Sequence, residues 1–295
     1  MINGTCGSTS LRVIVEHMNS SAQASAVAQF HALHQSGCFV LPNPWDVGTA
    51  IYLQHLGFKA LATTSAGFAF SRGLSDGKVP RDEMLAHLHD IAAATSLPVN
   101  ADFLNGYADE PEGVAHNVKL CIETGVAGLS IEDSTGNDDL PLYDEALAID
   151  RVRAARRAID DSKIPVVLTA RCEAWLVGHP DALNIARKKL VAFAEAGADC
   201  LYAPSVREPD EISELVKAVA PKPLNVLVSR PSEQLSVARL EDLGVRRISV
   251  GSALSAVAWG AFIRAAREIA ESGTFDSLSG AAPFADLNNL FSKRN

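Results

Sequence analysis

Short apolar runs in this chain stop repeatedly at a polar or charged residue. The eight runs are Cys38–Asn43, Ala60–Thr63, Pro98–Ala101, Gly128–Ile131, Pro165–Ala170, Cys200–Pro204, Pro223–Leu224 and Arg247–Gly251. The polar residues at or just after their ends are Asp46, Thr64, Ser65, Asp102, Glu132, Asp133, Arg171, Ser205, Asn225 and Ser252. Strands buried on both faces have continuous apolar sequences, and helix-like segments separate these runs, so the pattern predicts βα units around a parallel sheet. Eight units predict a closed (β/α)8 TIM barrel, in which the chemistry lies at the carboxyl ends of the strands.

Glycines placed between predicted helices and strands support one repeated architecture. Gly57, Gly125, Gly197 and Gly244 each follow a helix and precede an apolar run by a few residues, and glycine favours the left-handed backbone that ends a helix. The predicted helices are Val47–Leu56, Pro80–Ala94, Glu112–Thr124, Glu145–Asp160, Pro180–Ala196, Pro209–Ala220, Glu233–Leu243 and Leu254–Ser272. We therefore expect one barrel domain over residues 18–275, a disordered extension over residues 1–17 and a peripheral tail over residues 276–295.

Composition argues against several classes of partner. The 295 residues carry a net charge of −9, whereas nucleic acids and anionic membrane surfaces attract basic proteins. No apolar run reaches the roughly 18 residues that a membrane span requires. The five cysteines show no disulfide framework, which favours reduced thiols and a cytoplasmic location.

Carboxylates at the ends of two neighbouring strands point to a metal site. Asp102 ends one predicted strand and Glu132 ends the next, and adjacent strands lie roughly 4.8 Å apart, so the two side chains can converge. Oxygen ligands without nearby histidine or cysteine suit Mg²⁺ or Mn²⁺ better than Zn²⁺. The spacing fits equally well an ordinary role for these residues as helix caps.

Arg171 ends the following strand and is a candidate for binding an anionic substrate. A guanidinium there suits a carboxylate or phosphonate bound through two hydrogen bonds. The alternative is an arginine neutralised within the barrel by Glu132 or Glu173. The segment Thr63–Gly67 reads as a hydroxyl-rich turn, which either cradles an anion or is an ordinary Ser/Thr turn.

An ordered set of motifs resembles a known family. The motifs are Pro42–Asp46, Thr63–Gly67, Gly73–Gly77, Asp102 with Gly106 and Tyr107, Ile131–Asp133 and Ala170–Ala174. Together they resemble the isocitrate lyase and phosphoenolpyruvate mutase superfamily over Ser25 to Phe275. The resemblance implies a (β/α)8 barrel whose last helix is swapped between subunits of a homo-oligomer, a dimer or tetramer. It also implies Mg²⁺ (or Mn²⁺) and a small-molecule carboxylate substrate, such as a 2-oxo or 2-hydroxy acid.

The resemblance also assigns roles to single residues. Asp102 corresponds to the metal anchor, and Asp76 and Glu132 to residues that hold metal-bound water. Arg171 would contact the anionic groups of the substrate, so Asp76, Glu132 and Arg171 form the expected catalytic set. The expected substrate-binding residues are Trp45, Thr64, Ser65, Ala66, Arg171 and Asn225.

Departures from the family pattern narrow the activity. Leu104 stands where the family often has a second acid, and the segment from Asp133 to Tyr143 lacks the lysine and cysteine of the lyase gating loop. Pro204 stands where mutases place a histidine. We therefore expect a Mg²⁺-dependent carbon–carbon lyase or decarboxylase that forms an enolate. The alternatives are a phosphoenolpyruvate mutase or phosphonopyruvate hydrolase, and a non-catalytic 2-oxo acid binder. We also expect the loop after Asp133 to open and close over the site.

Overall fold

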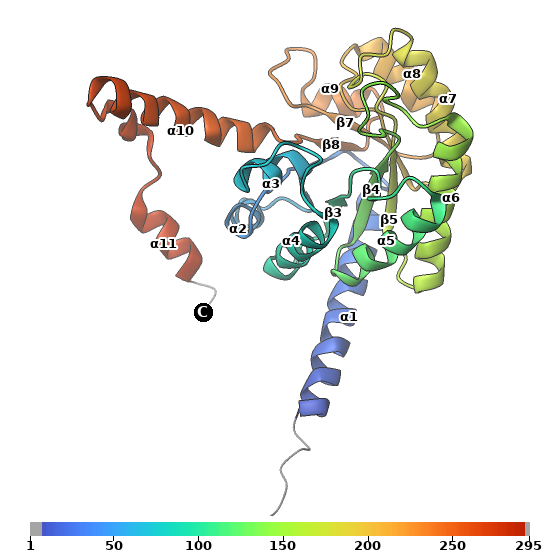
Figure 1. The fold of residues 1–295 in the computed structure, drawn as a ribbon, viewed down its shortest axis with the longest axis horizontal. Coiled ribbons are helices and arrows are strands. Elements are labelled where there is room, and N and C mark those ends of the chain that lie inside the picture. Colours follow the sequence, from blue (N-terminus) through green and yellow to red (C-terminus); the bar gives the residue numbers. More distant parts are fainter. Residues whose placement is uncertain (1–7, 293–295) are drawn as a thin grey trace, which may run out of the picture.

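Eight parallel strands form a nearly closed barrel (Figure 1), which confirms the predicted (β/α)8 fold. The computed structural model describes the backbone of residues 8–292 and the side chains from Ser21 to Ser292. The strands are β1 (Phe39–Leu41), β2 (Leu61–Ala62), β3 (Val99–Asp102), β4 (Gly128–Glu132), β5 (Val167–Arg171), β6 (Cys200–Tyr202), β7 (Leu224–Leu227) and β8 (Arg247–Ser249). All eight overlap the predicted apolar runs, although β7 continues through Asn225 to Leu227, beyond the predicted end at Leu224.

The ring has a seam between β1 and β2, which are the two ends of the hydrogen-bonded strand order. One backbone hydrogen bond crosses it, from the Ala62 N–H to the Pro42 carbonyl at 3.1 Å. The buried Asn43 side chain adds a strap. Its Nδ2 donates to the Thr63 carbonyl at 2.9 Å, and its Oδ1 accepts from the N–H groups of Val250 and Gly251 at 3.0 and 2.9 Å. A single side chain thus connects β1, β2 and the end of β8.

Helices follow the strands as the sequence predicts. They are α2 (Val47–His55), α4 (Arg81–Ala94), α5 (Pro111–Glu123), α6 (Glu145–Ser162), α7 (Ala182–Glu195), α8 (Pro209–Val219), α9 (Val237–Asp242) and α10 (Ala253–Ser272). The four glycines expected between helix and strand all have left-handed backbones, with φ between 85° and 106°. The helix-ending role assigned to them is therefore confirmed.

Four further elements were not expected from the sequence: α1 (Ser8–Leu33), α3 (Ser65–Ser71), η1 (Asp276–Gly280) and α11 (Phe284–Ser292). α1 passes through the expected domain boundary at residue 18, so residues 8–17 of the expected extension are helical here. Residues 1–7 lie outside the described part of the chain. The tail contains η1 and α11 (Figure 1), and α11 returns to the barrel helices, because a Cβ on Gly48 of α2 would lie 3.6 Å from the ring of Phe291.

The inside of the barrel is polar, which is unusual for this fold. Barrel interiors are commonly filled by bulky branched residues. Here the buried side chains that face the interior or its cavity include Asn100, Ser130, Thr169, Asn225 and Arg247. The apolar core lies instead between the outer surface of the barrel and the helices, with residues such as Leu129, Leu168 and Leu190 fully buried. This polar interior leads directly to the carboxyl ends of the strands.

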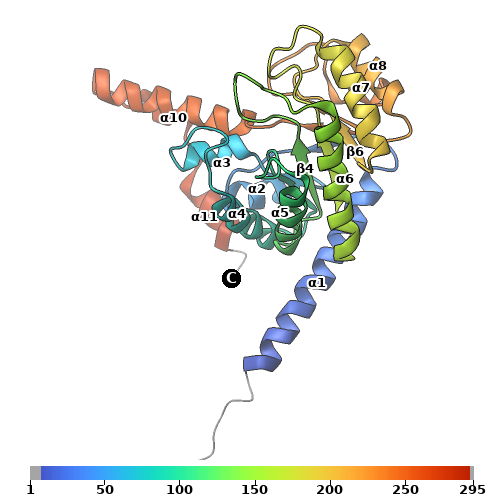
Figure 2. The same cartoon turned by 45° about the vertical axis from the view of Figure 1, so that its right-hand side comes forward.

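α10 projects away from the barrel as a long arm in both views (Figures 1 and 2). It exposes large apolar side chains, including Val257 and Phe262 at 69% and 61% exposure. An exposed apolar helix of this kind fits the expected swap between subunits, which stays a prediction for this single chain. Across residues 8–292, no helix combines the length and apolarity needed to cross a membrane.

Candidate active site

A cavity of about 300 Å³ opens at the carboxyl ends of the strands. The predicted site residues that line it are Thr64, Ser65, Ala66, Asp76, Asp102, Arg171 and Asn225. They come from four different βα units, so the barrel brings together residues that are up to 161 positions apart in sequence. Glu132 and Trp45 do not line this cavity.

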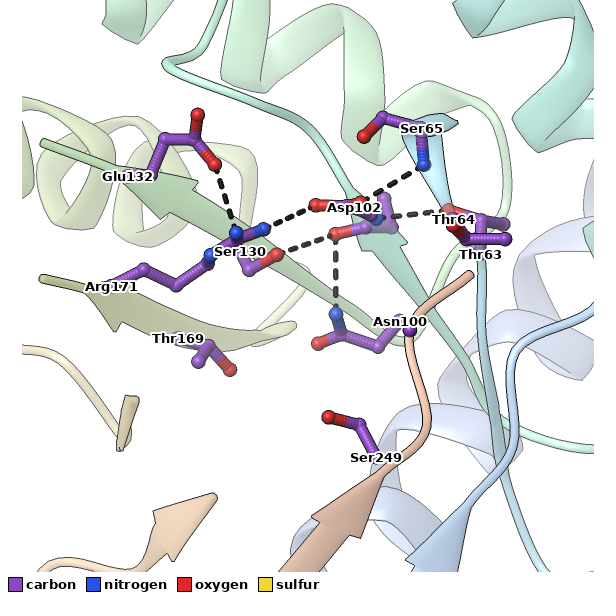
Figure 3. Close-up of polar contacts among 12 residues, drawn as sticks. Thr63, Thr64, Ser65, Asn100, Asp102, Ser130, Glu132, Thr169, Arg171 and Ser249 are labelled. Carbon is purple, nitrogen blue, oxygen red and sulfur yellow. Dashed lines mark hydrogen bonds and ion pairs between the residues drawn. The ribbon is translucent and has the colours of Figure 1, made fainter. Parts of the chain in front are cut away.

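Arg171 lies at the centre of a cluster of carboxylates (Figure 3). Its Nη1 contacts Asp102 Oδ1 at 2.6 Å, its Nη2 contacts Glu132 Oε2 at 3.1 Å, and its Nε contacts Glu173 Oε1 at 2.9 Å. The sequence left two interpretations open, substrate binding and neutralisation within the barrel. The structure shows the neutralising contacts, and it also places Arg171 in the cavity wall. Glu132 reaches the site through Arg171.

Asp102 is fixed by the strand and helix beside it. Its backbone N–H donates to Thr63 Oγ1 at 2.9 Å, and its Oδ2 accepts a hydrogen bond from the Ser65 N–H at 3.0 Å. The predicted turn over Thr63–Gly67 is wrong at this point, because helix α3 starts at Ser65. Thr64 is its N-cap, and the Thr64 Oγ1 accepts from the Gly67 N–H at 3.2 Å.

Trp45 packs beneath α3 outside the cavity. A Cβ atom on Gly67 would lie 3.1 Å from the Trp45 Cβ and 2.6 Å from the Thr64 Cγ2, so only glycine fits there. The expected contact between Trp45 and substrate stays a prediction, and the structure gives Trp45 a contact with the helix that carries Ser65.

Burial and mutual repulsion raise the pKa values of Asp76, Glu132 and Glu173. Burial, and then the Asp102 charge, raise the pKa of Asp76. Burial raises the pKa of Glu132 well above its ordinary value, although Arg171 opposes this shift. The Glu173, Glu132 and Asp102 charges outweigh burial and raise the pKa of Arg171. Three carboxylates contact one guanidinium and the Asp76 carboxylate lies near them, so the site as a whole favours an additional cation.

The donor set fits Mg²⁺ on chemical grounds. Asp102 and Asp76 present oxygen ligands, and both line the cavity. Within the described residues, no three His, Cys, Asp or Glu side chains are grouped closely enough to hold a metal alone. Mg²⁺ commonly takes one or two carboxylates and completes its shell with water and substrate. Asp102, with Asp76 and Glu132 acting through water, remains the predicted set.

Arg247 forms the floor of the cavity and was missed by the sequence analysis. Its Nε donates to Asn225 Oδ1 at 2.9 Å and its Nη2 to Thr169 Oγ1 at 3.0 Å. Its Nη1 lies 3.3 Å from His34 Nε2. No carboxylate among the described residues pairs with it, so the floor carries a buried positive charge. The signal in the sequence was an arginine inside a run that was otherwise read as a buried strand.

His34 is held in its neutral form below this arginine. Its Nδ1 lies 2.7 Å from the Phe30 carbonyl, which identifies Nδ1 as the donor and leaves Nε2 to accept from Arg247. Burial, and then the Arg247 charge, lower the pKa of His34 to about 3.

This arrangement predicts that His34 makes folding less favourable in acid. Below pH 6.5, the ordinary pKa, the unfolded chain takes up a proton that the folded His34 refuses until about pH 3. The unfolded state gains stability in that window, so the free energy of unfolding falls as the pH falls. We expect His34→Gln, whose amide oxygen still accepts from Arg247, to remove about 2 kcal/mol of the loss between pH 7 and pH 5. Urea unfolding at both pH values measures it. Equal losses in the two proteins would contradict the assignment.

The loop after β4 is a short hairpin that stands outside the cavity. Ser134 and Leu142 form an antiparallel bridge, and Thr135 N–H donates to the Pro141 carbonyl at 3.1 Å. Its base is anchored by the buried pair Lys189–Asp133 at 2.7 Å. No residue of this hairpin lines the cavity. The expected opening and closing stays a prediction.

The sequence is similar to one protein family along most of its length. The model of the family described as phosphoenolpyruvate phosphomutase matches residues 30–270. An uncharacterized protein of Mycobacterium tuberculosis is 35% identical over 261 residues, which are 88% of this chain and 94% of the relative. The 2-methylisocitrate lyase of Escherichia coli is 32% identical over 167 residues, which are 54% of this chain and 55% of that enzyme.

Solved structures show the same likeness. A crystal structure described as a putative lyase/mutase from Burkholderia cenocepacia is 46% identical, with a TM-score of 0.88, and the match covers 92% of this chain and 97% of that one. A structure of oxaloacetate acetylhydrolase with its product oxalate is 25% identical, with a TM-score of 0.81 and coverage of 92% and 95%.

Proposed function

Because the chain belongs to the phosphoenolpyruvate mutase family, within a superfamily of lyases and mutases, we propose that it is a Mg²⁺-dependent enzyme that breaks a carbon–carbon bond in a small 2-oxo or 2-hydroxy carboxylate. The cluster of Asp76, Asp102, Glu132 and Glu173 around the single Arg171 at the end of the barrel carries this proposal. The decarboxylation of a 2-oxo diacid fits the cavity best.

The chain's own residues would bind and orient the substrate. Arg171 has N–H groups beyond the three that contact carboxylates, and these donate to the carboxylate of the 2-oxo acid. Mg²⁺, held by Asp102 with Asp76 and Glu132 through water, would supply positive charge next to the 2-oxo group. The carbon–carbon bond to the departing carboxylate breaks, and carbon dioxide leaves. The electron pair of that bond stays on the remaining fragment and is delocalised onto the 2-oxo oxygen, which gives an enolate. A proton from water then returns to carbon.

The composition of the cavity wall favours this reaction over phosphonate chemistry. No histidine, cysteine or lysine is among the residues that line the cavity, within the described part of the chain. Pro204, which stands where mutases place a histidine, lines the wall. A reaction in which water supplies the proton requires no protein acid at that position. The mutase or hydrolase alternative, and the non-catalytic binder, remain as outcomes of the test.

The test is turnover of oxaloacetate and of phosphonopyruvate with Mg²⁺ and with excess EDTA. Free divalent cations decarboxylate oxaloacetate, so a protein-free sample at the same Mg²⁺ concentration is subtracted. We expect release of pyruvate from oxaloacetate that requires both protein and Mg²⁺. Turnover of phosphonopyruvate alone would replace the proposal with phosphonate chemistry. Binding of 2-oxo acids without turnover of either compound would identify a non-catalytic binder.

A further inference from the structure

The two sides of the cavity carry opposite charge. In the ring of eight strands, β3 faces β7 and β2 faces β6. Asp76 and Asp102 lie on the β2–β3 side. The part of the wall contributed by β6, β7, β8 and the loops that follow them contains Arg207, Arg230 and Arg247, and no acidic residue. α3 and α8 mark these two sides and lie on opposite sides of the barrel in both views (Figures 1 and 2).

Arg207 and Arg230 are free to bind a ligand. They lie in the loops after β6 and β7, both are exposed, and both line the cavity mouth. Among the described residues, neither makes an ion pair or a hydrogen bond. The acids closest to them in sequence, Glu208 and Glu233, are not part of the cavity wall. By contrast, Arg171 across the cavity already contacts three carboxylates.

A polarised cavity orients a substrate that has two different ends. The 2-oxo end of the substrate, which would bind the same Mg²⁺ ion as the carboxylates of the site, belongs beside Asp102. The opposite side offers two guanidinium groups, whose planar donors match a carboxylate. Arg247 keeps the floor of the same side positive, because its buried charge has no carboxylate partner among the described residues. An acidic group would therefore be attracted to this side of the cavity from its mouth to its floor.

We propose that Arg207 and Arg230 form a subsite for a second anionic group at the far end of the substrate, so that the protein selects 2-oxo diacids over 2-oxo monoacids. This inference rests on the proposed function, because it takes the 2-oxo end to lie beside Asp102.

Two ligands of equal chain length test it. 2-Oxoglutarate ends in a carboxylate where 2-oxovalerate ends in a methyl group. Calorimetry with Mg²⁺ present would give both dissociation constants for the wild type, for Arg207→Gln, for Arg230→Gln and for the double variant. Arg157→Gln is the matched control, because Arg157 is also exposed and has no partner among the described residues, but lies on α6 outside the cavity.

We expect the wild type to prefer the diacid, and the double variant to lose about tenfold in that preference, the size of one charge-assisted hydrogen bond. Affinity for 2-oxovalerate should stay unchanged in every variant, and the control should retain the full preference. An unchanged preference in the double variant, or no preference in the wild type, would overturn the subsite and leave the proposed function standing. If the wild type binds neither 2-oxo acid and does not turn over oxaloacetate, the proposed function falls and the subsite falls with it.

Discussion

Asp102→Asn is expected to lower turnover by about 100-fold or more and to abolish the dependence of ligand binding on Mg²⁺. Substitution of a residue that only hydrogen-bonds to a metal ligand commonly lowers metal affinity or activity roughly 10- to 100-fold. Loss of the metal ligand itself should therefore lower activity by at least the upper value. Although an amide NH2 replaces the Oδ1 that contacts Arg171, the remaining oxygen still accepts the Ser65 N–H, and the backbone N–H of residue 102 still donates to Thr63. The fold should therefore persist while the negative charge is lost.

Calorimetry with oxalate, with and without Mg²⁺, measures the binding effect, and circular dichroism checks the fold. Asp139→Asn is the control, because Asp139 is exposed in the loop after β4 and does not line the cavity. If folded Asp102→Asn binds oxalate with the same gain from Mg²⁺ as the wild type, Asp102 is not the anchor.

Arg171→Lys is expected to weaken ligand binding by about 1.5–3 kcal/mol, which corresponds to roughly 10- to 150-fold in the dissociation constant. Arg171 contacts Asp102, Glu132 and Glu173 through three different nitrogens. A lysine ammonium is a single centre and cannot span three carboxylates and a substrate. Arg187→Lys is a suitable control, because Arg187 pairs with Glu214 at the surface.

A second substitution separates the two roles of Arg171. Arg171→Met leaves three partly or fully buried carboxylates without their cation, and we expect it to lower the free energy of unfolding by about 3–5 kcal/mol. Urea unfolding measures that loss. If Arg171→Lys binds oxalate as tightly as the wild type while Arg171→Met is destabilised, Arg171 only neutralises the acids and does not contact the ligand.

The sequence predicted the strands and the charged centre because both depend on local rules. Each strand is an apolar run, and each run ends at the face where parallel strands converge. Asp102 and Arg171 could therefore be placed together although they are 69 residues apart. Helix α3 was not predicted, because a capping Thr64 followed by Ser65 has the same composition as a turn. A helix of seven residues offers little periodicity to distinguish the two.

The interior of the barrel escaped prediction for a different reason. The role of Arg247 depends on Asn225, Thr169 and His34, which are 22, 78 and 213 residues away. No local pattern indicates that these partners meet. Arg207 and Arg230 carry no sequence signal of their own, and only the curvature of the barrel brings them to the mouth of one cavity. The long-range geometry, rather than the chemistry of single residues, was the missing information.

The seam between β1 and β2 leads us to expect that a bound ligand affects the local stability of the barrel. Native proteins open locally most easily where few backbone hydrogen bonds must break, and a single backbone hydrogen bond between described residues crosses this seam. Ser65 borders the cavity on one side of it and Ser252 on the other. A molecule that contacts both would add a second connection across the seam, beside the one that Asn43 makes. We therefore expect the backbone at this seam to open less often when the cavity is occupied than when it is empty.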